Sequence, residues 1–171
     1  PEVLEKVGTH FEARASTRFS NAANLHDAVC NADLVIGAVL IPGAAAPKLV
    51  TRAMLKDMQK GAVLVDVAID QGGCFETSKP TTHADPTYVV DDIVHYCVAN
   101  MPGAVARTST YALNNVTLPH ALRIARMGWK DALAADPHLA EGLNVHKGEV
   151  TYEAVASELG YDYRPVAELT R

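Results

Sequence analysis

The chain has 171 residues, of which 49% are hydrophobic and 20% charged, the balance of a globular domain with a core. Its net charge of −5 argues against a nucleic-acid partner, because a protein that binds a phosphate backbone needs a basic face. No apolar run approaches the roughly 18 residues that a membrane span requires, so we expect no membrane insertion.

The cysteines and histidines indicate neither a disulfide scaffold nor a metal site. There are three cysteines, Cys30, Cys74 and Cys97, and no CxxC motif, which is typical of a reducing compartment such as the cytoplasm. We interpret all three as small buried hydrophobic residues. No two histidines have a metal-ligand spacing such as HxxxH, so we expect no bound metal. The chain starts with Pro1 and not Met, which indicates processing or a longer parent protein.

The first third of the chain shows helical periods and one strand-like stretch. "PEVLEKV" has the composition of a first helical turn. A short strand is expected around Phe11–Ala15. Apolar residues at helical spacing predict a helix over residues 22–32, with Asn21 or Ser20 as its cap, and another over residues 46–58.

Three unbroken apolar runs of strand length follow one another, at residues 33–40, 61–69 and 93–99. Such runs, alternating with helical segments, are typical of a parallel sheet that helices cover on both faces. We therefore predict an α/β fold, the later part of a doubly wound parallel sheet.

The composition becomes helix-prone after Arg107. We expect a helix capped by Thr108 or Ser109 and broken or kinked at Pro119. A short helix is expected between a Thr151 N-cap and Gly160. Residues 108–171 are thus interpreted as a helical extension of a sheet domain that spans residues 1–107, and not as a second sheet.

Each apolar run ends in a loop with glycine beside polar residues or proline: "VLIPGAAAPK", "AIDQGGCF" and "ANMPGAVARTS". In doubly wound sheets ligands bind outside the carboxyl ends of the strands. Asp70 is either a turn carboxylate or a carboxylate at the mouth of a nucleotide cleft, whereas Asp66 is expected to be structural. Asn100 and Met101 are either a turn residue and a core residue, or an amide ligand and an apolar wall for a flat ring.

Three segments carry a family resemblance: "ADLVIGAVLIPGAAAPKLVTRAML", "GAVLVDVAIDQGGCFETSKPTTHADPTY" and "HYCVANMPGAVARTSTYALNN". They closely resemble bacterial alanine dehydrogenase, and the match covers essentially the whole chain. The resemblance implies a Rossmann-type NAD domain in a homohexameric cytoplasmic enzyme. It also implies reversible NAD-dependent oxidative deamination of L-alanine to pyruvate and ammonium.

The resemblance assigns roles to individual residues. Asp70 corresponds to the active-site Asp of the family, between the nicotinamide and the substrate. The positions that match cofactor contacts are Ser20, Val39, Leu40, Val67, Ala68, Ile69, Asp70, Lys79, Val98, Ala99, Asn100 and Met101.

Parts of the family pattern are absent from these residues. Gly8 is the only glycine before Gly37, so the chain has no GxGxxG phosphate loop at its start. The family's catalytic domain, with its substrate-binding Arg and Lys and its catalytic His, has no counterpart either. We therefore expect this chain alone to be inactive and to expose an apolar sheet edge.

Two other interpretations stay open. The alpha subunit of proton-translocating NAD(P) transhydrogenase shares the "IPG…APKL" segment, but that family has neither an Asp at the position of Asp70 nor "NMPGAV". The other is a non-catalytic module that binds a partner subunit or part of a nucleotide.

Overall fold

The computed structural model describes residues 2–170 and divides them into two compact units. The sheet unit comprises the described residues through Ala38 together with Pro47–Ala99. The helical unit comprises Val39–Ala46 and the described residues from Asn100 onward. The predicted functional boundary at residue 107 stays a prediction.

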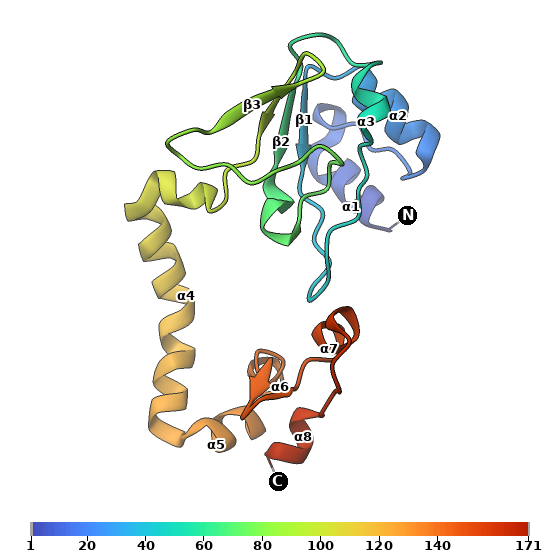
Figure 1. Ribbon diagram of the computed structural model, residues 1–171. Coiled ribbons are helices and arrows are strands. Elements are labelled where there is room, and N and C mark those ends of the chain that lie inside the picture. The colour runs from blue at the N-terminus through green and yellow to red at the C-terminus, as the bar shows by residue number, and fades with distance from the viewer. Residues whose placement is uncertain (1, 171) are drawn as a thin grey trace. The chain divides into compact units, whose positions relative to one another are not determined.

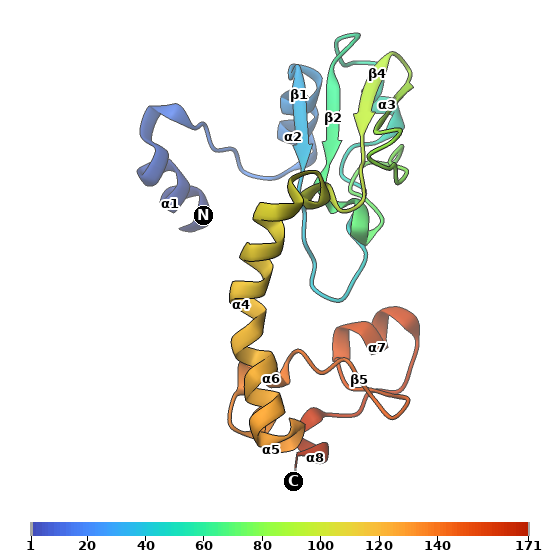
Figure 2. The same ribbon diagram turned by 90° about the vertical axis from the view of Figure 1, so that its left-hand side faces the viewer.

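The sheet unit is built on four strands in the order β1-β2-β4-β3. β1 (Leu34–Gly37), β2 (Val63–Asp66) and β4 (Ile93–Tyr96) are parallel and lie side by side (Figure 2). β3 (Thr87–Val90) pairs antiparallel with β4 at the other edge. The three apolar runs therefore form the parallel strands, which confirms the predicted α/β class.

The central strands and the β1 edge of the sheet differ in burial. Leu64 of β2 and Ile93 of β4 are almost completely buried, together with Phe75 from the loop after β2. By contrast, β1 is an edge strand in which Leu34 and Ile36 are 54% and 62% exposed. We expected helices to cover both faces of the sheet, and this expectation is wrong at β1. The expected exposure of an apolar sheet edge is confirmed there.

Helices of the sheet unit follow local capping signals. They are α1 (Glu2–Phe11), η1 (Glu12–Arg14), α2 (Ala22–Cys30), α3 (Arg52–Leu55) and η2 (Val67–Gln71). Asn21 caps α2, because its side chain accepts a hydrogen bond from the Asn24 amide at 2.8 Å. The predicted strand at Phe11–Ala15 is wrong, since these residues end α1 and form η1.

The helix predicted over residues 46–58 is reduced to α3. Val50 is drawn into a β-bridge with Phe75, and the Thr51 side chain then caps the short helix through the Met54 amide. The long-range bridge thus overrides the helical period at Val50.

The helical unit contains one long helix and several short elements. These are η3 (Met101–Val105), α4 (Ala106–Met127), α5 (Trp129–Ala134), α6 (Pro137–Ala140), α7 (Glu153–Leu159), α8 (Val166–Leu169), and the hairpin of β5 (Val145–His146) and β6 (Glu149–Val150). The hairpin corrects the expectation of a purely helical extension.

Of the break or kink expected at Pro119, the break is wrong, because α4 runs through this residue without interruption (Figure 1), and the kink stays a prediction. Pro119 is exposed, so water can satisfy the carbonyl that the missing N–H leaves unpaired. Ser109 is not a cap, since its hydroxyl donates to the Pro102 carbonyl inside the unit.

The end of the chain follows the prediction in part. Thr151 does not cap α7; its hydroxyl donates to the Leu143 carbonyl at 2.6 Å. Gly160 has φ = 70° and ends α7 as predicted. Within residues 2–170, no helix combines the length and the hydropathy that crossing a bilayer requires.

Candidate functional site

Asp70 lies in η2, the turn that follows the carboxyl end of β2. Ala68 and Ile69 point into the core, with exposed fractions of 7% and 4%, and they anchor this turn. Asp70 is exposed, and Val67 at the start of the turn is 48% exposed. The turn therefore presents a carboxylate and an apolar side chain at the end of the sheet where ligands of doubly wound folds bind.

Two glycines end this turn in the left-handed region, with φ = 86° at Gly72 and φ = 76° at Gly73. Their amides donate to the carbonyls of Ile69 and Ala68, both at 3.0 Å. A Cβ on Gly73 would lie 2.6 Å from Oδ2 of Asp66. The glycines following Asp70 thus let the chain reverse and pass directly over β2.

Asp66 is the acceptor around which this loop is built. It is fully buried and accepts hydrogen bonds from the amides of Cys74 at 2.9 Å and Phe75 at 3.4 Å, and from the Ser78 hydroxyl. These donors compensate the buried charge. The predicted structural role of Asp66 is confirmed, but the residue holds a loop and caps no helix.

Lys48 is a residue that the sequence patterns did not single out. Its ammonium group donates to the carbonyl of Gly73 at 2.7 Å and to that of Gly72. It therefore holds the glycine pair from the side of the first loop. The available signal was its place at the end of "IPGAAAPK", the loop that follows β1.

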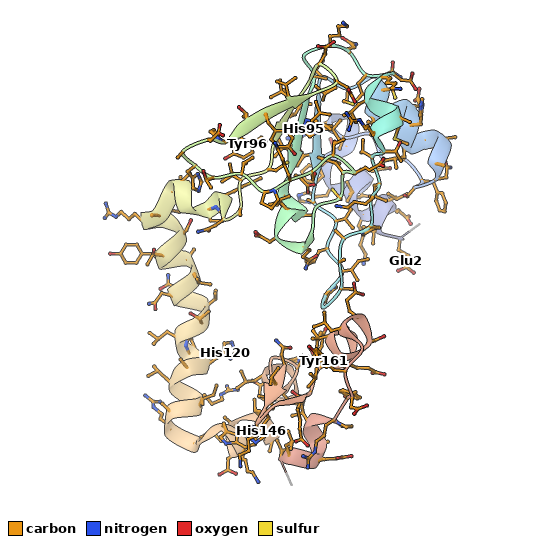
Figure 3. The ribbon with its side chains drawn as sticks, viewed as in Figure 1. Glu2, His95, Tyr96, His120, His146 and Tyr161 are labelled. Atoms are coloured by element: carbon orange, nitrogen blue, oxygen red, sulfur yellow. The ribbon has the colours of Figure 1, made fainter. Side chains whose placement is uncertain are left out.

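A buried histidine on β4 supports the same loop. His95 is fully buried among the strands (Figure 3); its Nδ1–H donates to the Ile93 carbonyl at 3.0 Å, so its Nε2 accepts from the Thr77 hydroxyl at 2.7 Å. Burial lowers the pKa of His95, because it disfavours the charged imidazolium. The neutral ring stacks on Tyr88 with centroids 4.9 Å apart.

Lys79 is fixed against the same tyrosine. Its amide donates to the Tyr88 hydroxyl at 2.8 Å, and its ammonium group lies 4.4 Å from the ring centroid. The Tyr88 hydroxyl in turn donates to the Thr77 carbonyl at 2.9 Å. Burial, as the main cause, raises the pKa of Tyr88 well above its ordinary value, so the hydroxyl stays a donor. A role of Lys79 in cofactor binding stays a prediction.

The other predicted cofactor residues are divided between the units. In the sheet unit, Ser20 is exposed and precedes the Asn21 cap of α2, Val98 is fully buried and Ala99 is exposed. In the helical unit, Leu40 is 69% exposed, whereas Val39 and Met101 are half-buried. The joint approach of these residues to one ligand stays a prediction.

Asn100 opens a concave apolar surface within the helical unit. It adopts the left-handed conformation, with φ = 59°, and its carbonyl accepts from the Gly103 amide at 2.9 Å. A cavity of about 780 Å³ lies between η3 and α4. Its lining is formed by Asn100, Pro102, Gly103, Ala106, Ser109, Thr110, Ala112, Leu113 and Val116. The volume lies in the range of small-molecule and cofactor sites.

Comparison with known proteins gives consistent matches over nearly the whole chain. A family profile described as "Alanine dehydrogenase/PNT, C-terminal domain" matches residues 1–153. Alanine dehydrogenase of Halomonas elongata is 64% identical over 166 residues, covering 97% of this chain and 45% of that protein. Alanine dehydrogenase of Mycolicibacterium smegmatis is 55% identical over 165 residues, covering 96% of this chain and 44% of that protein.

Solved structures agree with these relatives. A structure titled L-alanine dehydrogenase superposes with a TM-score of 0.80 at 49% identity, over 93% of this chain and 44% of that chain. A transhydrogenase from Sinorhizobium meliloti superposes with a TM-score of 0.61 at 28% identity, over 90% of this chain and 40% of that chain. The chain thus spans less than half the length of these relatives. It belongs to the alanine dehydrogenase/PNT family and corresponds to the carboxyl-terminal domain of that family.

Proposed function

We propose that the protein to which this chain belongs is an alanine dehydrogenase. It would catalyse the reversible NAD-dependent oxidative deamination of L-alanine to pyruvate and ammonium. The observation that carries this proposal is the 64% identity to the Halomonas elongata alanine dehydrogenase across 97% of the chain. The closer superposition on L-alanine dehydrogenase than on transhydrogenase supports the same choice.

The residues at the end of β2 fit the nicotinamide half of the cofactor. The exposed Val67 offers an apolar surface for a flat ring, and the exposed Asp70 offers a carboxylate beside it in the same turn. The chain has no GxGxxG segment, so the amides that hold the pyrophosphate must come from residues outside it. Bound NAD would supply the hydride acceptor.

Asp70 is the proposed catalytic residue. Oxidation of an amine leaves positive charge on the substrate nitrogen, and the subsequent addition of water releases a proton. A carboxylate in a fixed position can stabilise that charge and accept that proton. The buried anchors Ala68 and Ile69 fix the backbone on which Asp70 is mounted.

The second half of the chain is proposed to pack on the catalytic domain of the complete enzyme. No residue of α4 is buried, and the helix exposes seven large apolar side chains: Tyr111, Leu113, Val116, Leu118, Leu122, Ile124 and Met127. A helix with this much exposed apolar surface ordinarily has a partner. In the same proposal, the complete enzyme is a homohexamer in the cytoplasm. It uses NAD in preference to NADP.

The direct test is the reaction itself in the intact protein. L-Alanine should drive NADH formation, D-alanine should not, and pyruvate with ammonium should drive NADH oxidation. Binding of NADH without turnover of L-alanine would refute the enzyme and favour the non-catalytic module.

The 171-residue chain alone is predicted to have negligible affinity for NAD, because it lacks the phosphate loop. Isothermal titration of the isolated chain with NADH measures this affinity. Saturable binding in the micromolar range would contradict the prediction.

A further inference from the structure

A cluster of three different metal-ligating side chains lies in the sheet unit, on the helices beside the sheet. His26 and Cys30 are separated by one turn on the same face of α2. Asp57, which follows α3, places Oδ2 3.1 Å from Nε2 of His26. Sγ of Cys30 lies 3.7 Å from the same nitrogen, and donor atoms of the three residues all lie within 4.8 Å of one another.

Two of these separations lie near the edges of a tetrahedral zinc site. Zinc bonds of about 2.0–2.2 Å to nitrogen and oxygen and about 2.3 Å to sulfur give tetrahedral edges of roughly 3.4 Å for N···O and roughly 3.6 Å for S···N. The distances between the side chains are 3.1 Å and 3.7 Å. An ion could therefore enter after rotation of the exposed His26 and Asp57 and of the half-buried Cys30, whose sulfur lies within 4.8 Å of a carboxylate oxygen of Asp57.

We propose that His26, Cys30 and Asp57 form a binding site for a zinc ion. Imidazole, thiolate and carboxylate are the three ligand types that zinc takes in proteins, and the fourth position would be filled by water. This set has no paired histidines; it combines a histidine and a cysteine of α2 with an aspartate from the turn after α3. The proposal does not depend on the proposed enzymatic function.

The surroundings of Cys30 favour a cation. The residue is half-buried, and its Sγ lies 3.8 Å from the Met54 carbonyl. The Asp57 carboxylate lies beside the sulfur and attracts a divalent ion. On binding, the thiol proton leaves to solvent and the sulfur bonds to the metal.

Bound metal would join α2 to the segment that follows α3. In the described structure this link is the hydrogen bond between His26 and Asp57, both of them exposed. Exposed pairs of this kind contribute little to stability. A ligand that binds only the folded state stabilises it by mass action, so zinc should raise the thermal midpoint of the intact protein.

The test is spectroscopic and uses Co²⁺ and then Zn²⁺ alone with the intact reduced protein. Cobalt should give a thiolate charge-transfer band and tetrahedral visible bands, and zinc should abolish both. Cys30→Ser should remove the charge-transfer band, although Cys74 and Cys97 remain. His26→Gln and Asp57→Asn should each weaken zinc binding at least about tenfold.

Two exposed residues outside the cluster supply matched controls. His120→Gln on α4 (Figure 3) and Asp33→Asn before β1 make the same chemical changes and should leave zinc affinity unaltered. The proposal is overturned if the wild-type protein gives no thiolate band, if the band survives in Cys30→Ser, or if the controls weaken zinc binding as much as the cluster variants. His26 and Asp57 are exposed, so their variants keep the test decisive if Cys30→Ser disturbs packing.

Discussion

Asp66 and Gly73 depend on each other at the residue scale. The buried carboxylate needs donors from the returning loop, and the loop can come close enough only where a residue has no Cβ. Lys48 holds the glycine carbonyls from the other side. The turn that carries Asp70 is therefore fixed by three residues in addition to its own apolar anchors.

The two glycines offer a matched pair of variants. Gly72→Ala should cost about 1–2 kcal/mol, since its φ of 86° is left-handed and no atom lies within 4 Å of the added Cβ. Gly73→Ala has the same backbone cost and adds a contact at 2.6 Å to Asp66, for roughly 1–3 kcal/mol more. Urea denaturation gives both values, and equal losses would refute a steric role of Asp66 and of Ser78, whose Cβ would lie 2.8 Å from the added Cβ.

His95 makes stability depend on pH. Burial lowers its pKa in the folded protein, so the unfolded chain binds the proton more strongly. The free energy of unfolding should be fully retained above the ordinary histidine pKa of about 6.5 and fall as the pH drops below it, by at most about 1.4 kcal/mol per pH unit.

The variant that tests this effect is His95→Gln, which keeps hydrogen-bonding capacity and removes the titration. Its free energy of unfolding should differ less between about pH 7.5 and about pH 5.5 than that of the wild type. His10→Gln, at an exposed histidine of α1, should retain the wild-type dependence. An unchanged dependence in His95→Gln would exclude His95 as its source.

At the scale of elements, β1 is the unprotected part of the sheet. It pairs with β2 on one side only, and Leu34 and Ile36, which project from the same face of the strand, are exposed. An apolar edge strand is a template for pairing with another chain. Leu34→Lys or Ile36→Lys should therefore reduce aggregation of the 171-residue chain in light scattering. Val3→Lys, at a residue of α1 that is 71% exposed, should not, and an equal reduction there would argue against edge pairing.

Elements with strong local signals could be predicted from the sequence. The three apolar runs became parallel strands, Asn21 capped α2, and Gly160 ended α7. Elements decided by distant partners could not. The bridge from Val50 to Phe75, for example, shortened the helix around α3. The β5–β6 hairpin is local, but its strands have only two residues each, too few to show a period, and only the turn at Lys147 and Gly148 marks it.

The residues of the candidate site also separate into those that a local pattern predicts and those that depend on distant parts of the chain. The position of Asp70 just after a strand could be predicted, because an apolar run that ends before two glycines is a local sequence pattern. The roles of Lys48 and His95 could not be predicted, because each depends on how the segment after Gly72 folds back over the sheet. The zinc cluster was missed for a similar reason, since Asp57 meets His26 only once α2 and α3 are packed.

At the scale of the whole molecule, the family assignment covers both units, whereas the proposed reaction needs residues beyond them. The chain covers 45% of the Halomonas elongata enzyme and lacks a phosphate loop. In the proposed enzyme, the sheet unit would contribute the carboxylate and the helical unit an apolar helix surface. Catalysis is therefore a property to be measured on the intact protein.

The most direct measurement is the steady-state rate of L-alanine-dependent NADH formation by the intact protein carrying Asp70→Asn. Asp33→Asn, an equal charge change at the amino end of β1, is the control. We predict that Asp70→Asn lowers kcat at least about 100-fold with NADH affinity largely retained, and that Asp33→Asn leaves both unchanged. Wild-type turnover in Asp70→Asn would remove Asp70 from the mechanism and contradict the proposed site.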